Sequence, residues 1–450
     1  MITHETKPTK IIPFIREWPL VGSLPAFVQK NPMDFLRQVA HRSDVCGFHL
    51  GPFPLVLFNN AEYVQSILVE HADDLNKGRL IHHAFGGNGL FVSEGAFHRR
   101  QRKVMAALFQ PRHIAAYAET IVQYGERLQQ EWHDGAVVDL NQLMIAVTMS
   151  IIGKVLFDSD VFDKTDELAA ALAVVNEEVV HRVTSPFQAP RSWPTPRNLR
   201  VRRAVQVVQN HIQHLIEERR ASRTERNDFL SILLLATDED GKAMSDEQLM
   251  DECLTLFGAG HETTAAALSW AWYLLCQHPE VYQKVQQEVE SVLAGRAPTY
   301  DDLAHLPYCL QVFKETLRLY PPAPVVREAL HDIEIDGYLV PKGYTIYIVP
   351  YTLHRQAEYF PDPERFDPER FTPAREKQLP RYAYLPFGAG PRICIGNHFA
   401  LMEGQLLLAT LAGRVSFTLV PGQTIEPDPK HHLTFSPGGK MEVIVKRCNL

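Results

Sequence analysis

The chain has 450 residues, and 45% of them are hydrophobic, which is enough to form a large buried core. Its formal net charge is -8 and its pI is near 6.2, and this acidic balance argues against general nucleic-acid binding, which usually needs a basic surface. The six cysteines are scattered and none forms a CxxC pair, so neither a disulfide framework nor a clustered zinc site is expected.

The distribution of residues along the chain predicts one domain, over residues 1–450, in a soluble cytoplasmic protein. There is no internal repeat, low-complexity tract or long linker. The start of the chain has no signal-peptide pattern, and no uncharged apolar run reaches the ~18–20 residues that span a bilayer. Scattered, reduced cysteines also fit the cytoplasm. We therefore expect no membrane anchor.

Short apolar or alternating runs predict a few strands, and most other segments have helical spacing. The expected elements, in chain order, are a strand at 54–60, a helix around 97–103, a proline-rich surface loop at 185–198, a long helix within 244–281, strands at 333–340 and 344–351, an irregular segment at 360–373 that packs on the protein body, and a helix at 395–413. The predicted fold is mainly α with a small β subdomain, in which the N-terminal β-rich part and the larger helical part are not independent.

The long helix within 244–281 carries the first candidate site. Ser245 followed by Gln248 matches a capping box, and His278-Pro279 supplies the stop. Roughly 30 helical residues would span ~45 Å, so an apolar helix of this length must cross the middle of the protein. Its interior contains "GAGHETT" (258–264), with two glycines beside a carboxylate and two hydroxyls. The glycines serve either close helix packing or a groove for a small ligand, where Glu262 and Thr263 would manage protons.

The segment "KETLRLYPP" (314–322) places Glu315 and Arg318 on one helix face. If the pair is exposed, it contributes little to stability. If the segment at 360–373 folds back onto this helix, Arg370 becomes a third partner. A buried Glu–Arg–Arg network would then fix that segment to the helix.

The loop "FGAGPRICIG" (387–396) holds Cys394 among three glycines. An apolar helix follows directly, so we expect Cys394 at a helix N-terminus, where free N–H groups and the helix dipole favour its thiolate. A lone cysteine is usually a small buried hydrophobe. Here the glycines let the backbone approach closely and turn sharply. A single thiolate with an open opposite side suits a haem iron.

A haem also needs cationic partners for its propionates. Arg392 is two residues from the cysteine, and His98 and Arg102 lie four apart on one helix face. Arg327 is a further candidate. Three other basic residues of the same helix are expected to face solvent, namely Arg99, Arg100 and Lys103.

These motifs together resemble the cytochrome P450 family over roughly residues 15–448. The loop at 387–396 fits the family's cysteine signature F-x-x-G-x-R-x-C-x-G, and "ETLR" (315–318) is similar to its E-x-x-R. "AGHETT" resembles the oxygen-groove motif, and "PERF" (368–371) resembles the loop that completes the E-x-x-R network. The four motifs occur in the family's order. The implied fold is that of a cytochrome P450, with haem between the long central helix and the cysteine-loop helix.

The resemblance implies roles for the site residues and a haem-thiolate monooxygenase that uses haem b and O2. Cys394 would be the axial ligand of the iron. Phe387 would pack near the sulfur, and backbone groups beyond Cys394, around Gly396, would tune the iron. Glu262 and Thr263 match the acid–alcohol pair that delivers protons. Four residues match propionate-binding positions: His98, where many relatives have Trp, Arg102, Arg327 and Arg392.

Family position also implies an apolar substrate pocket above the haem, and therefore a lipophilic substrate. The expected pocket residues come from "HHAFGGNGLF" (82–91), which includes Phe91, together with Ala259, Ala323, Val325 and Leu433. "GNGLF" and "AGHETT" are more similar to fatty-acid hydroxylases than to camphor-type members, which favours a fatty acid or another long lipophile. No basic residue marks a carboxylate site, so terpenes and steroids stay open as alternatives.

Electrons are expected from a separate ferredoxin or flavodoxin with its reductase, because the chain ends 56 residues after Cys394. Arg99, Arg100 and Lys103 would suit docking of such an acidic partner. Two other functions are left open: a peroxygenase, which typically lacks the acid–alcohol pair, and a non-enzymatic haem sensor or lipid carrier, which does not need it. The default assembly is a monomer.

Overall fold

The computed structural model describes residues 10–29, 32–130, 132–160, 166–184, 188–222, 226, 228–238, 240–428 and 434–448. The chain forms two compact units, each taken by itself here. The first comprises Met1–His83, Ala323–Arg365 and Pro373–Cys394, and the second comprises Ala84–Pro322, Phe366–Thr372 and Ile395–Leu450. Helices account for 56% of the structure, which confirms the predicted mainly α class with a small sheet region.

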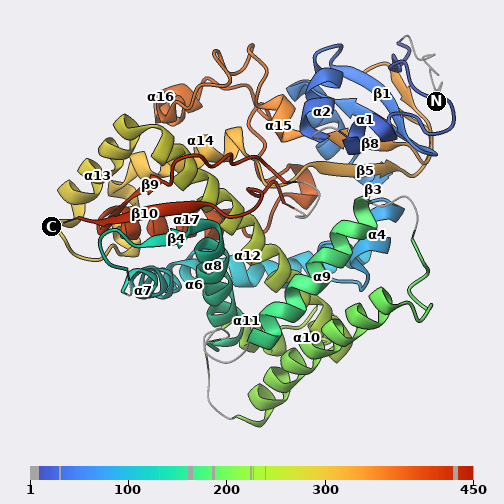
Figure 1. The fold of residues 1–450 in the computed structure, drawn as a ribbon. Helices are drawn as coiled ribbons and strands as arrows, with labels where there is room; N and C mark the ends of the chain where they lie inside the picture. Colours follow the sequence, from blue (N-terminus) through green and yellow to red (C-terminus); the bar gives the residue numbers. More distant parts are fainter. Residues whose placement is uncertain are drawn as a thin grey trace. The chain divides into compact units, whose positions relative to one another are not determined.

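The first unit is built on a five-stranded sheet in the order β1-β2-β8-β5-β3. Its strands are β1 (Val45–Leu50), β2 (Phe53–Phe58), β3 (Leu75–Asn76), β5 (Val325–Ala329) and β8 (Thr345–Ile348). Only the β2–β8 pair is parallel. Helix α2 (Pro32–Ala40) buries Phe35, Leu36 and Val39 against β1 and β2, so this sheet has its own apolar core (Figure 1).

Two of the three predicted strands are confirmed as β2 and β8. The third, at 333–340, is a hairpin of β6 (Ile333–Ile335) and β7 (Tyr338–Val340). The reason is the Asp336-Gly337 turn, in which both residues have positive φ, +48° and +88°. The short elements that remain before residue 90 and after residue 349 are α1 (Leu24–Gln29), α3 (Ala61–Gln65), the π-helical turn η1 (Ser66–Glu70), η2 (Ala72–Asp74), α4 (Arg79–Phe85), α15 (Pro350–Leu353), α16 (Pro373–Glu376) and η7 (Gly390–Arg392).

The second unit is helical. Its central helix α12 (Asp246–Gln277) packs against α8 (Leu140–Phe157), α14 (Pro307–Leu319) and α17 (Asn397–Ala412). Helices α9 (Asp166–Thr184) and α10 (Pro196–Ala221) lie side by side (Figure 1). The others are α5 (Gly95–Met105), η3 (Ala106–Phe109), α6 (Pro111–Ala116), α7 (Ala118–Gln129), α11 (Phe229–Leu235), α13 (Pro279–Leu293), η5 (Tyr300–His305) and η6 (Pro368–Phe371). A three-stranded sheet, β4-β10-β9, joins β4 (Val137–Asp139), β10 (Glu442–Arg447) and β9 (Val415–Leu419).

Helix α8 is long and apolar enough to span a membrane by length and composition, but 72% of it is buried inside the protein. Burial of this extent is typical of a core helix. A lysine and an asparagine interrupt the apolar run of α8, so the sequence predicts no membrane span there.

The proline-rich segment predicted as a surface loop at 185–198 is irregular over its described residues 188–195, but residues 196–198 belong to α10 instead. Pro196 starts that helix because proline suits the first helical position. The segment at 360–373, predicted to be irregular, contains the short 3-10 turn η6 and ends at Pro373, where α16 begins. Phe366 and Phe371 are buried, which confirms that the segment packs on the protein body.

Candidate active site

The cysteine loop belongs to the first unit as far as Cys394, whose thiol is exposed, and its last two residues, Ile395 and Gly396, belong to the second unit. Cys394 follows the short turn η7, and its N–H donates a hydrogen bond to the Phe387 carbonyl at 2.9 Å. Helix α17 begins only at Asn397, with Gly396 as its N-cap, so the predicted position of Cys394 at the helix N-terminus is wrong by three residues. The physical reason is the backbone of Gly396, whose φ of -90° and ψ of 11° are not helical, so the helix begins only after it.

Two glycines shape this loop for different reasons. Gly388 and Gly390 have φ values of +69° and +68°, in the left-handed region that favours glycine. A Cβ on Gly390 would also lie 1.8 Å from the Leu68 carbonyl oxygen of η1, which no side chain can tolerate. A Cβ on Gly388 would meet nothing closer than Val325, at 3.9 Å. The loop is therefore seated directly on the backbone of η1.

This loop fits a haem. All six cysteines lie in the described part of the chain, and Cys394 alone among them is exposed. A thiol presented by a rigid glycine turn suits a single axial ligand. Arg392 is half-buried in the same loop, and Arg327 on β5 is buried and donates to the Val326 carbonyl at 2.8 Å. Guanidinium groups are well suited to bind carboxylates such as propionates.

The other two propionate candidates lie in the second unit. His98 is buried and Arg102 is half-buried, and both belong to α5, four residues apart as predicted. Arg99, Arg100 and Lys103 are exposed on the same helix, which confirms their predicted solvent-facing position.

Each of the two interpretations of the α12 glycines applies to one of them: Gly260 serves helix packing, and Gly258 borders open space. The helix is capped by Ser245, whose side chain accepts the Gln248 N–H, and it extends over 32 residues. A Cβ on Gly260 would lie 2.8 Å from the Ile152 side chain of α8, so this glycine serves close helix packing. A Cβ on Gly258 would meet no atom of the described residues within 4 Å, and the neighbouring Ala259 is exposed although it lies mid-helix. One turn of α12 therefore presents open space.

The acid–alcohol pair follows this open turn. The Thr263 hydroxyl donates to the Ala259 carbonyl at 2.9 Å. The Glu262 carboxylate accepts one hydrogen bond from the Asn176 amide of α9, at 3.1 Å, and one from the Thr434 hydroxyl, at 3.2 Å. Thr434 is itself 2.7 Å from the Ser436 hydroxyl. Asn176, Thr434 and Ser436 are not predicted from the sequence, because an isolated Asn, Thr or Ser carries no motif.

The Glu–Arg–Arg network forms within the second unit. Glu315 and Arg318 are fully buried on α14 and make two hydrogen bonds, of 2.7 and 2.8 Å. Arg370 of η6 approaches the Glu315 carboxylate at 3.4 Å. The Asp367 N–H adds a hydrogen bond to it at 2.9 Å. The structure thus brings together all three predicted residues, and the exposed-pair alternative is wrong.

A further buried acid lies between α12 and α17. Glu403 is 1% exposed, and the Thr264 hydroxyl, next to the acid–alcohol pair, hydrogen-bonds to its carboxyl group. Burial raises the pKa of Glu403 to about 8. The sequence signal that could have identified it is one acidic residue within the apolar run of 395–413.

The predicted pocket residues are distributed over both units. Phe91 and Ala259 belong to the second unit, and Phe91 packs on Phe85 with ring centroids 4.8 Å apart. Ala323 and Val325 belong to the first unit and are exposed and half-buried. Leu433 lies outside the described residues.

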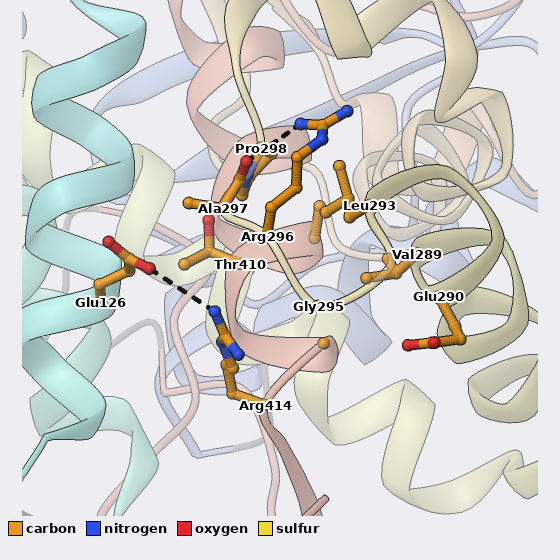
Figure 2. Close-up of a pocket in the computed structure, with 12 residues that line it drawn as sticks. Glu126, Val289, Glu290, Leu293, Gly295, Arg296, Ala297, Pro298, Thr410 and Arg414 are labelled. Atoms are coloured by element: carbon orange, nitrogen blue, oxygen red, sulfur yellow. Dashed lines mark hydrogen bonds and ion pairs between the residues drawn. The ribbon is translucent and has the colours of Figure 1, made fainter. Parts of the chain in front are cut away.

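A small hollow elsewhere in the second unit contains none of the predicted site residues. Its cavity volume is about 10 Å³, room for about one water molecule. Figure 2 shows Arg414 reaching toward Glu126, at 4.0 Å, beside Arg296 and the end of α13. A hollow of this size holds no organic substrate.

Comparison with known proteins identifies the family. The family model described as "Cytochrome P450" matches residues 12–443. "Cyclooctat-9-en-7-ol 5-monooxygenase" of Streptomyces melanosporofaciens is 37% identical over 412 residues, which cover 90% of this chain and 89% of that protein. "Pentalenene oxygenase" of Streptomyces avermitilis is 32% identical over 407 residues, which cover 89% and 90%.

A solved structure agrees. "Retinoic acid bound cyanobacterial CYP120A1" matches with a TM-score of 0.85 at 26% identity, covering 97% of this chain and 99% of that one. Together with the cysteine loop and the acid–alcohol pair, these matches show that the chain belongs to the cytochrome P450 family and is a monooxygenase of that family.

Proposed function

We propose that this protein is a haem b monooxygenase that inserts one oxygen atom of O2 into a C–H bond of a terpenoid or related lipophilic small molecule. Family membership implies a haem cofactor, the use of O2, a redox partner and a small-molecule substrate. When bound, the haem supplies the oxidation of the C–H bond, and the protein supplies position, protons and exclusion of water. Cys394 would be its axial ligand, and four cationic side chains would hold its propionates: His98, Arg102, Arg327 and Arg392.

The observation that carries this proposal is the pair of neighbours Glu262 and Thr263, each of which makes hydrogen bonds to other residues. Glu262 is held by Asn176 and Thr434, and Thr263 is a hydroxyl next to it on the open turn of α12. The Glu262 carboxylate can take up a proton at its oxygen, and the neighbouring Thr263 hydroxyl can pass a proton toward the open turn. Because the partners of Glu262 come from α9 and from residues 434–436, the carboxylate is oriented rather than free to swing.

The substrate class rests on the apolar pocket residues and on the relatives. Two relatives carry names that specify oxidation of cyclooctat-9-en-7-ol and of pentalenene, which are terpene oxygenase activities. This supports the terpene alternative over the fatty acid that the sequence motifs favour. Steroids remain a third class that an apolar pocket would admit.

The electron donor is proposed to be a separate ferredoxin or flavodoxin that docks on α5. Arg99, Arg100 and Lys103 form an exposed basic face on this helix, although the whole chain carries a net charge of -8. Local positive charge of this kind accelerates association with an acidic partner. We expect a cytoplasmic monomer.

The first experiment is the ferric absorption spectrum of the purified holoprotein during titration with terpenes, fatty acids and steroids. A ligand that displaces water from the iron shifts the Soret band. We expect the tightest response from a polycyclic terpene, and a response to fatty acids alone would overturn the terpene proposal. A Cys394→Ser variant should lose the thiolate-type spectrum, while Cys448→Ser, a half-buried cysteine, should keep it. An unchanged spectrum in Cys394→Ser would overturn the ligand assignment.

The proton role of Thr263 is tested by coupling. Thr263→Ala should lower the product formed per electron consumed by about 100-fold, at the lower end of the range of general acid–base contributions. Thr263→Ser restores the hydroxyl and should recover most of it. Full coupling in Thr263→Ala would contradict the role and favour the sensor or carrier alternative. Turnover with hydrogen peroxide alone, without gain from a reductase, would instead favour a peroxygenase.

A further inference from the structure

The loop at residues 86–90, Gly-Gly-Asn-Gly-Leu, is held on α12 by two consecutive carboxylates. The Asn88 N–H donates to the Asp251 carboxylate at 2.6 Å, and the Leu90 N–H donates to the Glu252 carboxylate at 2.8 Å. The Asp251 and Glu252 carboxyl groups each accept a backbone N–H, and such hydrogen bonds are stronger where the acceptor is ionised. The backbone of the loop is therefore bound at two points to one turn of α12.

Gln248 extends this arrangement. Its side-chain amide donates to the Asn88 carbonyl at 3.2 Å and to the second oxygen of Glu252 at 2.6 Å. The amide thus binds the loop and fixes the carboxylate at the same time. Gln248 and Glu252 are both buried, and Glu252 is fully inaccessible to solvent.

The glycines of the loop allow this close approach. A Cβ on Gly89 would lie 2.1 Å from the Thr255 hydroxyl and 2.7 Å from the Asp251 carbonyl oxygen. A Cβ on Gly87, which has φ +64°, would lie 2.8 Å from the Asp251 carboxylate. Any larger residue at either position would move the loop away from α12.

Burial of the Glu252 carboxyl group at this position costs free energy. Burial is the main influence on its carboxyl group and raises its pKa to about 7, while the Leu90 and Gln248 hydrogen bonds act in the opposite direction. A buried acid is stable only where hydrogen bonds compensate its burial. The Leu90 N–H and the Gln248 amide provide this compensation, so the Glu252 carboxyl group is tied to the loop that it holds.

The residue that follows the loop is Phe91, a predicted wall of the substrate pocket. Phe91 is 38% exposed and packs on Phe85. The Val92 and Ser93 N–H groups bond back to the Gly89 carbonyl at 3.0 and 2.9 Å, so the turn that carries Phe91 continues the loop without a flexible break. Displacement of the loop would displace the aromatic ring.

We propose that Asp251 and Glu252 are positioning residues for the substrate: they hold the 86–90 loop against α12 and thereby fix Phe91 in the substrate pocket. The proposal rests on the proposed function for the pocket, but the carboxylate clamp itself stands on the hydrogen bonds of the loop. Neither residue touches the reacting atoms. Their effect is on which large ligands fit, and not on the oxidation itself.

The clamp is tested by amide hydrogen exchange in the full-length holoprotein. In Asp251→Ala and Glu252→Ala, the Asn88 and Leu90 amides should exchange about 10- to 100-fold faster, as expected for the loss of a hydrogen bond to a charged acceptor. Glu252→Gln keeps an acceptor for the Leu90 N–H and should retain most of the protection. Glu247→Gln, on the exposed face of the same helix, is the matched control. Core amides of α12 should be unchanged in Asp251→Ala, which separates loop release from global unfolding.

The consequence for the pocket is tested with two haem ligands of different size. Imidazole is a small ligand, whereas 1-dodecylimidazole carries a long alkyl chain that would fill more of an apolar pocket. In Asp251→Ala the dissociation constant of 1-dodecylimidazole, measured from the Soret shift, should change about tenfold while that of imidazole stays within about twofold. Equal changes for both ligands, or unchanged exchange of the Asn88 and Leu90 amides, would overturn the proposal. A protein without haem would give no Soret shift at all, which would refute the proposed function, and the amide exchange would still test the clamp.

Discussion

Single residues determine the geometry of the cysteine loop, and Gly390 shows this most clearly. Its backbone is in the left-handed region, and the Leu68 carbonyl occupies the place where a Cβ would be. Gly388 has nearly the same φ but has room for a methyl group. A substitution at Gly388 therefore tests backbone strain alone, whereas one at Gly390 tests strain together with a steric clash.

We predict that Gly390→Ala disrupts the loop and that Gly388→Ala is tolerated with a smaller loss. A left-handed alanine costs roughly 1–2 kcal/mol, and this cost applies to both variants. Only Gly390→Ala adds a backbone clash, so it should also lower the haem bound per protein. Urea unfolding and the Soret absorbance per protein measure the two effects. Equal losses in both variants would contradict the seating of Gly390 on η1.

The buried Glu315 makes a second prediction at this scale. Glu315→Gln removes the charge that balances Arg318 and Arg370, and loss of one partner from a buried pair costs about 3–5 kcal/mol. Glu369→Gln is the matched control, because Glu369 pairs with Lys284 at 3.0 Å but both side chains are largely exposed. Exposed pairs contribute about 0–1 kcal/mol. The free energy of unfolding checks both, and a loss below about 1 kcal/mol in Glu315→Gln would show that the network is not structural.

At the scale of elements, the contact between α12 and α17 is unusual because it buries an acid. Glu403 of α17 hydrogen-bonds with Thr264 of α12 in an otherwise apolar interface. Its pKa is raised from 4.5 to about 8, so the folded protein keeps this group neutral at pH values where the unfolded chain ionises it. Thr263, the alcohol of the acid–alcohol pair, is the neighbour of Thr264 on α12.

This contact predicts a pH dependence of stability. Between about pH 4.5 and 8 the folded state binds more protons at Glu403 than the unfolded state, so stability falls as pH rises, by up to about 1.4 kcal/mol per pH unit. Glu403→Gln removes this term. Its stability relative to the parent should therefore increase from pH 5 to pH 8, whereas that of the exposed Glu247→Gln should stay flat. Denaturant unfolding at several pH values measures this, and a pH-independent difference would contradict the neutral Glu403.

At the scale of the whole molecule, charge is distributed unevenly. The net charge is -8, yet α5 presents an exposed basic face beside the propionate candidates of the same helix. Helix α10 offers a comparison, because Arg200, Arg202 and Arg203 are also exposed. Electrostatic steering would act at α5 and not at α10 if the electron donor docks where proposed.

We predict that reversing Arg99, Arg100 and Lys103 to Glu lowers the rate of reduction by an acidic ferredoxin about tenfold at low salt. The difference should shrink at high ionic strength, because the screening length falls from about 10 Å at 0.1 M to about 3 Å at 1 M. The matched variant reverses Arg200, Arg202 and Arg203. Stopped-flow reduction at two salt concentrations decides the matter, and an unchanged rate in the α5 variant at low salt would exclude this docking face.

Features that depend on near neighbours along the chain could be predicted from the sequence. The adjacency of Glu262 and Thr263, the helical spacing of Glu315 and Arg318, the Ser245 cap of α12 and the glycines around Cys394 follow from local geometry, which the order of residues dictates. The start of α17 lies three residues beyond Cys394, because the Gly396 backbone is not helical.

Which distant groups meet depends on the packing of the folded chain. The partners of Glu262 are 86 and 172 residues away, and Leu90 lies 162 residues from Glu252. Such pairs are chosen by the packing of whole helices and by the need to satisfy buried polar groups, and neither leaves a local pattern. For the same reason, the choice between packing and open space at Gly260 and Gly258 depended on whether Ile152 of α8 lies against the helix.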